Sequence, residues 1–189
     1  HVRSNPETNY FYFKIVKITR NLFFVSKIKV LFVCLGNICR SPLAEAIFKH
    51  KIIQKGLEKW IEIDSCGTSN YHIGEMPDRR TIANATKNGI CIDHLGRQLK
   101  PRDLEYFDYV LAMDRSNLEN ILRLKNAAYV KHKIMLMRHF DPVKDGDEVP
   151  DPYYGGEQGF QDVYDMLNRT MEVFIQHLKE KHQSFIATS

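Results

Sequence analysis

The chain has 189 residues, of which 43% are hydrophobic, and these proportions suit one globular domain with a substantial core. A net charge of +4, without a dense basic stripe and interleaved aromatic residues, argues against a nucleic-acid-binding protein. Four cysteines, two of them in one short loop, do not form the pattern of a secreted disulfide framework, so we expect a reducing, cytoplasmic compartment.

Residues 1–27 form an N-terminal extension of uncertain role. Its apolar and aromatic stretch, residues 10–25, is interrupted by Lys14, Lys17 and Arg20, which leaves no uncharged run of about 18 residues for a membrane-spanning helix. No A-x-A-like cleavage site follows this stretch. We favour an extra element packed on the domain, or upstream sequence, although the basic character leaves a targeting or membrane-contacting segment open.

An apolar strand over residues 28–33 leads into the loop Cys34–Arg40, and Pro42 then opens a helix. The five residues between Cys34 and Arg40 let the backbone curl, so that its N–H groups and the helix N-terminus surround an oxyanion. Arg40 adds a planar fork for two phosphoryl oxygens, and positive surroundings favour a reactive thiolate. Taken singly, these are a core cysteine and a solvated arginine, but the C-x5-R-S pattern predicts a phosphate-binding loop.

Strands and helices alternate along the rest of the chain, which is typical of a parallel α/β sheet. We expect strands at residues 60–64, 108–113 and 133–137, helices that open at residues 77, 101 and 115, and a last amphipathic helix marked by apolar residues from 160 to 178. The pattern predicts an α/β fold of three layers, an open sheet of four parallel strands flanked by helices, with strand order left open. Residues 28–182 form the single domain and residues 183–189 a C-terminal tail.

A second candidate for chemistry is Asp151, which lies between Pro150 and Pro152 and is followed by two tyrosines. The prolines restrict the backbone on both sides, so the loop presents its carboxyl group rigidly. Such a group can protonate a leaving group that departs poorly at neutral pH, such as the phenolate of tyrosine, whose pKa is about 10. Taken alone, an aspartate between prolines is also a common turn residue.

The segment Val30–Pro42, which reads VLFVCLGNICRSP, resembles the signature of the low-molecular-weight protein tyrosine phosphatases, and the resemblance extends from about Lys27 to Lys181. It implies the flavodoxin-like phosphatase fold and hydrolysis of phosphotyrosine in proteins through a phosphocysteine, with neither cofactor nor metal. Cys34 would be the nucleophile and Asp151 the general acid and base. The phosphate would be bound by Leu35, Gly36, Asn37, Ile38, Cys39 and Arg40, of which Arg40 is also catalytic.

The same resemblance implies roles for residues that would otherwise be ordinary loop residues. A hydrogen-bond network that braces the loop would comprise Asn37, Ser41, Ser65 and His94. The aromatic walls of a cleft deep enough to select phosphotyrosine over the shorter phosphoserine would be Tyr71, Tyr153 and Tyr154.

Cys39 is expected to form a reversible disulfide with an oxidised Cys34, a redox role that we favour over that of a loop filler. Cys66 and Cys91 have no assigned role and are expected to be buried thiols.

Two other functions compete with tyrosine phosphatase activity. An arsenate reductase opens with a similar loop but needs a resolving cysteine pair after the third strand, where residues 111–117 contain no cysteine. A non-catalytic phosphotyrosine-binding module would be expected to lack the nucleophile or the acid, and both Cys34 and Asp151 are present. Both alternatives are therefore weaker than the phosphatase.

Overall fold

The computed structural model describes residues 27–144 and 146–183. The expectations for residues 1–26 and for most of the C-terminal tail lie outside the described residues, and the proposed domain limits stay predictions. Within the described ranges, no helix is long and apolar enough to cross a membrane.

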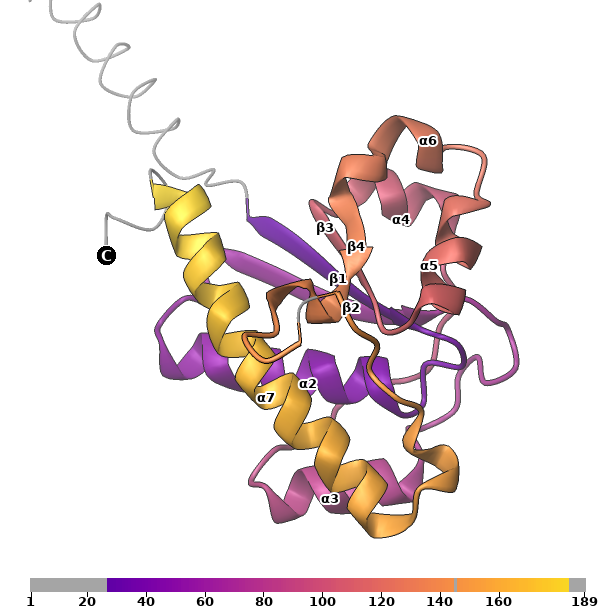
Figure 1. Ribbon diagram of the computed structural model, residues 1–189, viewed down its shortest axis with the longest axis vertical. Helices are drawn as coiled ribbons and strands as arrows, with labels where there is room; N and C mark the ends of the chain where they lie inside the picture. The colour runs from indigo at the N-terminus through magenta and orange to yellow at the C-terminus, as the bar shows by residue number, and fades with distance from the viewer. Residues whose placement is uncertain (1–26, 145, 184–189) are drawn as a thin grey trace, which may run out of the picture.

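One sheet of four parallel strands lies at the centre of the molecule (Figure 1). The strands are β1 (Ile28–Cys34), β2 (Ile61–Gly67), β3 (Tyr109–Ala112) and β4 (Ile134–Leu136), and their order is β2-β1-β3-β4. The prediction of a four-stranded parallel sheet is confirmed. The expected loop at Ser65 is wrong, because β2 continues to Gly67: Ser65 and Cys66 are fully buried and pair with β1.

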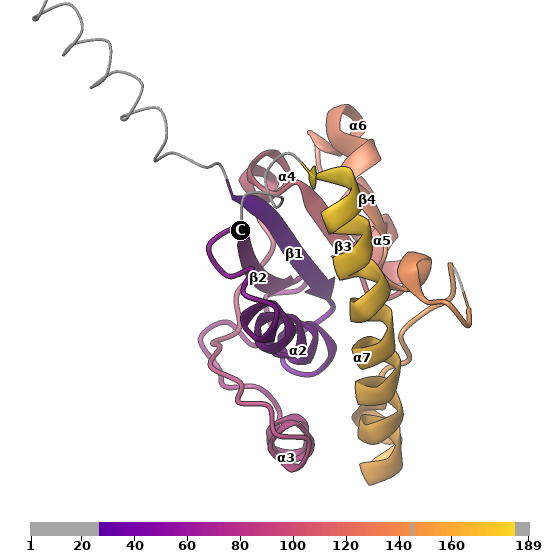
Figure 2. The same cartoon turned by 90° about the vertical axis from the view of Figure 1, so that its left-hand side faces the viewer.

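Helices cover both faces of the sheet (Figures 1 and 2). One face packs against α2 (Arg40–Gln54), α3 (Arg79–Lys87) and α7 (Gly156–Lys181). The other face packs against α4 (Pro101–Tyr106), α5 (Arg115–Leu122) and α6 (Ala127–Val130). The described residues also contain three short 3-10 helices, namely η1 (Lys131–Lys133), η2 (Met137–Phe140) and η3 (Pro152–Tyr154).

The larger core lies between the sheet and α7. The expected apolar face of α7 is buried at Val163, Leu167, Met171, Phe174 and Leu178. This spacing of three and four residues keeps one stripe of the helix on the core, as the sequence pattern predicted. The rings of Phe48 and Phe174 stack with centroids 5.3 Å apart, which ties α2 to α7.

The chain order of the strands creates a crevice at their carboxyl ends. From β1 the chain passes to β2 on one side, and it returns to β3 on the other side. Loops that leave such neighbouring strands in opposite directions open a ligand-binding crevice. Cys34 ends β1 at this point, with Gly67 of β2 as its register partner.

Candidate active site

The loop after β1 wraps around the sulfur of Cys34. The backbone N–H of Asn37 points at Cys34 Sγ over 3.2 Å, and Ser41 Oγ lies 3.0 Å from the same sulfur. Asn37 has a φ of 57°, and among the described residues it is the one non-glycine residue in this left-handed conformation. An asparagine tolerates this conformation better than most side chains, and it turns the N–H inward.

The helix after the loop begins two residues earlier than the sequence pattern predicted. α2 starts at Arg40, so that Pro42 is its third residue and not its first. This placement is compatible with proline, because the first four N–H groups of a helix have no intrahelical acceptor. The positive N-terminus of a four-turn helix therefore points at Cys34.

The amide of Asn37 connects the start of α2, the end of β2 and the segment that carries His94 and Arg97. Its Nδ2 donates to Ser41 Oγ and to Ser65 Oγ, each over 2.9 Å. Its Oδ1 accepts from the backbone N–H of Arg97 over 2.9 Å and contacts His94 Nε2 at 2.7 Å. The structure thus brings together the four supporting residues expected from the resemblance, and it adds the main chain of Arg97.

Glu45 completes this network and was not singled out from the sequence. Its Oε2 accepts from Ser65 Oγ over 2.6 Å and lies 3.0 Å from His94 Nδ1, and Lys49 also donates to its carboxylate. Burial alone would raise the pKa of Glu45, but the hydrogen bonds from His94, Lys49 and Ser65 lower it overall. The sequence feature that could have identified Glu45 is its position as an acidic residue within an apolar helical run, one turn after Ser41.

His94 connects Asn37 to Glu45 through its two ring nitrogens. Its Nε2 lies 2.7 Å from Asn37 Oδ1, to which the N–H of Arg97 also donates. Its Nδ1 lies 3.0 Å from Glu45 Oε2. The imidazole ring is therefore held from both sides.

Arg40 is buried, with 4% of its surface exposed, and it joins the loop to two carboxylates. Its Nη1 bonds Asp114 Oδ2 at 2.6 Å and the carbonyl oxygen of Val149 at 3.1 Å, and its Nη2 lies 3.2 Å from Asp151 Oδ2. Burial by itself would lower the pKa of Arg40, but Cys34, Asp114 and Asp151 raise it overall. Asp114 was missed in the sequence because an aspartate before a helix reads as an ordinary N-cap, and it also has that role toward Asn117.

Asp151 lies on a short, well-defined turn. Its side chain caps η3 by accepting the N–H of Tyr153 over 3.1 Å, and Pro152 is buried behind it. Arg80 donates to the carbonyl oxygen of Tyr153 over 2.8 Å and places its guanidinium 4.7 Å from the ring centroid of that tyrosine. The carboxyl group remains half exposed and faces the same cavity as Cys34.

A cavity of about 350 Å³ opens above the loop. Its lining consists of Cys34, Leu35, Gly36, Ile38, Cys39, Arg40, Tyr71, His72, Asp151, Tyr153 and Tyr154. The nucleophile candidate is at its floor, with 3% of its surface exposed, whereas Tyr71 is 72% exposed. The three tyrosines expected at the cleft therefore do border it, and His72 joins them although nothing in its sequence context marked it.

The remaining cysteines differ in their surroundings. Burial raises the pKa of Cys39 to about 12, so this residue is a neutral thiol at physiological pH. All four cysteines are free thiols, and the redox pairing of Cys39 with Cys34 stays a prediction. Cys66 is buried as expected, but the expectation for Cys91 is wrong: it is exposed, because the segment after α3 crosses the surface and buries its neighbour Ile90 instead.

Glu45, Asp64 and His94 place potential metal ligands within 4.8 Å of one another. Each is already bonded within the protein, Glu45 to Ser65, Asp64 to Arg97 and His94 to Asn37. A metal ion would have to break these bonds, so the group forms an ion-pair and hydrogen-bond network in preference to a metal centre.

Taken together, the fold and the site define an α/β protein whose loop after β1 places Cys34 beside the buried Arg40, with Asp151 facing the same cavity. The family model described as "Low molecular weight phosphotyrosine protein phosphatase" matches residues 29–184. The chain belongs to this family.

Individual relatives agree with this assignment. The low molecular weight phosphotyrosine protein phosphatase of Schizosaccharomyces pombe is 50% identical over 141 residues, which are 74% of this chain and 90% of that protein. The human protein of the same description is 41% identical over 148 residues, or 78% of this chain and 93% of that protein.

Solved structures share the fold. A protein tyrosine phosphatase from Entamoeba histolytica, with Hepes in its active site, is 41% identical with a TM-score of 0.77, covering 82% of this chain and 99% of that chain. A structure described as DARP, drosophila arginine phosphatase, is 36% identical with a TM-score of 0.72, covering 80% of this chain and 98% of that chain.

Proposed function

We propose that this protein is a cysteine-dependent protein tyrosine phosphatase that acts on phosphotyrosine in proteins. The observation that carries the proposal is the meeting of three groups in one cavity. Cys34 Sγ receives an inward N–H at 3.2 Å, and Arg40 from the same loop reaches Asp151 at 3.2 Å. A nucleophile, a fixed cation and an acid on one cavity are the parts that phosphoryl transfer requires.

In the first step, the sulfur of Cys34 attacks phosphorus as the bond to the tyrosine oxygen breaks. Inward N–H groups and Arg40 hold the three equatorial oxygens, and Asp151 donates its proton to the departing oxygen. The products are free tyrosine in the substrate protein and a phosphocysteine. Arg40 can turn Nη2 toward phosphate because Asp114 and Val149 keep Nη1 in place.

In the second step, water attacks the phosphocysteine and the sulfur–phosphorus bond breaks. Asp151, which is now a carboxylate, takes the proton of this water as its oxygen bonds to phosphorus. Inorganic phosphate leaves and Cys34 returns as a thiolate. The neighbouring helix N-terminus and the N–H of Asn37 favour sulfur as the negatively charged leaving group in this step.

The depth of the site supports phosphotyrosine as the substrate. Cys34 lies at the floor of the cavity, whereas Tyr71 and Tyr153 stand at its mouth, so a long and flat phosphorylated side chain reaches the sulfur with its ring between tyrosines. Phosphoserine is too short for this reach. Phosphoarginine is also long enough to reach the sulfur, so the peptide assay below compares it directly with phosphotyrosine.

We infer a reducing compartment such as the cytoplasm, because oxidation of Cys34 would stop catalysis. The proposed binding partners of the domain are phosphotyrosine-containing proteins, which are its substrates. We propose neither a nucleic acid nor a membrane as a partner of the described residues. The arsenate reductase alternative is not favoured, because residues 111–117 around the end of β3 contain no cysteine, and Asp114 of this segment bonds Arg40.

The first prediction concerns turnover of para-nitrophenyl phosphate and of three phosphopeptides that carry phosphotyrosine, phosphoserine or phosphoarginine. Cys34→Ser should abolish turnover, because the hydroxyl is a far weaker nucleophile than the thiolate. Asp151→Asn should lower turnover of the phosphotyrosine peptide on the order of 10² to 10⁴-fold. Full activity of the Cys34→Ser protein, or preference for phosphoserine or phosphoarginine, would contradict the proposal.

A further inference from the structure

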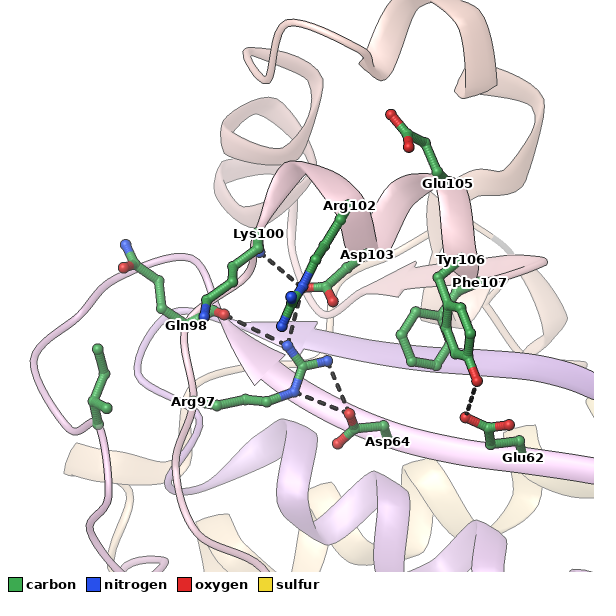
Figure 3. A pocket seen from close by; sticks show the side chains of 11 residues that line it. Glu62, Asp64, Arg97, Gln98, Lys100, Arg102, Asp103, Glu105, Tyr106 and Phe107 are labelled. Carbon is green, nitrogen blue, oxygen red and sulfur yellow. Dashed lines mark hydrogen bonds and ion pairs between the residues drawn. The ribbon is translucent and has the colours of Figure 1, made fainter.

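A second cavity, of about 870 Å³, lies between β2 and α4, on the sheet face opposite α2 and α7 (Figure 3). Arg97 lies across this cavity, on a segment outside the helices and strands that pairs with the end of β2 through one isolated bridge, between Gln98 and Gly67. The same arginine already appeared at the candidate active site through its backbone N–H. The side chain of Arg97 therefore lies in the second cavity, and its main chain contacts Asn37 of the candidate active site.

Two carboxylates from different elements hold the guanidinium of Arg97. Nε and Nη2 each lie 2.9 Å from Asp64 Oδ2 of β2, and Nη1 lies 2.9 Å from Asp103 Oδ2 of α4 (Figure 3). Asp103 is itself buried and held by the N–H of Lys100 over 2.7 Å. Because the guanidinium is planar and its donors point in fixed directions, these two ion pairs restrain the orientation of the whole residue.

The main chain of Arg97 is restrained in the direction of the phosphate loop. Its carbonyl oxygen accepts the N–H of Gly67 over 2.8 Å, at the end of β2. Its N–H donates to Asn37 Oδ1 over 2.9 Å. With Oδ1 held, the Nδ2 of Asn37 is directed at Ser41, and the N–H of Asn37 is directed at the sulfur of Cys34.

We propose that Arg97 is a positioning residue for the phosphate loop, acting through Asn37 from the side of the molecule opposite α2. The proposal rests on the proposed function, because the effect of Arg97 on turnover is measured through catalysis by Cys34. The ion pairs to Asp64 and Asp103 add to the single bridge between Gln98 and Gly67, and together they hold the N–H of Arg97 where Asn37 accepts it. Without them the N–H moves, the amide of Asn37 loses one of two restraints on its oxygen, and the loop N–H groups no longer converge.

The test is a double-mutant cycle between Arg97 and Asn37, measured as kcat for para-nitrophenyl phosphate. Arg97→Met keeps the length of the side chain but removes both ion pairs, and it should lower kcat on the order of 10-fold or more. Asn37→Gly removes the amide while tolerating the positive φ. In the Asn37→Gly background, Arg97→Met should lower kcat by no more than about twofold, because the residue through which it acts is gone.

Arg102→Met is the matched control. Arg102 lines the same cavity and is exposed, and no ion pair of its side chain occurs among the described residues. Its replacement should leave kcat within about twofold of the starting protein. Arg97→Lys should recover part of the loss, since one ammonium can still reach a carboxylate. An equal loss from Arg97→Met in both Asn37 backgrounds, or an equal loss from Arg102→Met, overturns the proposal.

A readout without turnover separates this proposal from the proposed function. Hydrogen exchange of the Asn37 side-chain NH₂, followed by NMR, should accelerate at least 10-fold in Arg97→Met, by a smaller factor in Arg97→Lys, and stay unchanged in Arg102→Met. If Arg97→Met does not fold, Arg97→Lys and Asp64→Asn carry the same measurement. If exchange is faster in Arg97→Met but the Cys34→Ser protein keeps its turnover, the phosphatase proposal is rejected and the positioning role is kept. If exchange in Arg97→Met is unchanged, the positioning role is rejected.

Discussion

Glu45 links the charge of the network around Cys34 to pH. Its side chain is 5% exposed and bonds Ser65, His94 and Lys49 at once. A buried carboxylate is costly unless it is bonded in this way, so the three donors keep it ionised inside the protein. The bonds that orient Asn37 therefore depend on the ionisation of a residue that does not line the cavity.

The pH dependence of stability tests this role of Glu45. Because the pKa of Glu45 lies below its ordinary value of 4.5, the carboxylate stabilises the fold above that pH, and this stabilisation is lost as the pH falls through the lowered pKa. Glu45→Gln should cost about 3 kcal/mol of unfolding free energy at neutral pH, and the difference should shrink in acid. Urea unfolding at several pH values measures it, with the exposed Glu58→Gln as the control. A difference that stays constant with pH would contradict the ionised state.

At the scale of elements, the start of α3 connects the loop of Cys34 to the turn that carries Asp151. The N–H of Asp78, which caps α3, donates to the carbonyl oxygen of Ile38 in the phosphate loop over 2.8 Å. The carboxylate of Asp78 bonds Arg80, with its Oδ2 2.7 Å from Nη2, and Arg80 in turn donates to the carbonyl oxygen of Tyr153. One helix terminus thus fixes the distance between the loop of Cys34 and the turn that carries Asp151.

Replacing Arg80 should therefore impair the acid more than the nucleophile. We expect Arg80→Met to lower kcat for phenyl phosphate about 10-fold and for para-nitrophenyl phosphate about twofold, because only the poorer leaving group depends strongly on protonation. Steady-state kinetics with both esters measures the ratio. The neighbouring Arg79→Met is the control, since Arg79 is exposed and does not face Tyr153. Equal losses with both esters would show that Arg80 does not act on Asp151.

At the scale of the whole molecule, α7 joins the parts of the fold without contributing to the cavity. Figure 1 shows it passing α3 and α2 on its way to the far end of the sheet. Phe174 is fully buried at its centre, with ring centroids 5.3 Å from Phe48, 4.7 Å from Phe140 and 5.5 Å from Tyr109. These contacts connect α2, η2 and β3 through a single side chain.

Removing that ring should destabilise the entire domain. Phe174→Ala should lower the free energy of unfolding by about 4 kcal/mol, because a buried cavity replaces the packed contacts with Phe48, Phe140 and Tyr109. Cooperative urea unfolding, followed by fluorescence and circular dichroism, measures the loss. Val173→Ala on the exposed side of the same helix should change stability by less than about 0.5 kcal/mol. A loss below about 1 kcal/mol for Phe174→Ala would contradict the central position assigned to α7.

Much of the fold followed from local patterns. The strands, the helix after Cys34 and the apolar stripe of α7 were predicted because side-chain periodicity reports the local backbone and the face that is buried. The loop Cys34–Ser41 could also be identified from the sequence, since its residues are contiguous and their contacts span few positions. Asp151 was singled out by its two prolines, which restrict the backbone without any distant contact. The catalytic and binding roles of these residues stay predictions.

Other features were decided only in three dimensions. The strand order places β3 beside β1, and this brings Asp114 to Arg40 across 74 positions of sequence. Glu45, Arg80 and Arg97 also have partners distant in sequence, namely Ser65, Tyr153 and Asp64. Sequence alone determined which groups could do the chemistry, because chain neighbours set the loop and the turn. Tertiary structure decided how those groups are held, because charged side chains select partners by distance in space and not by position in the chain.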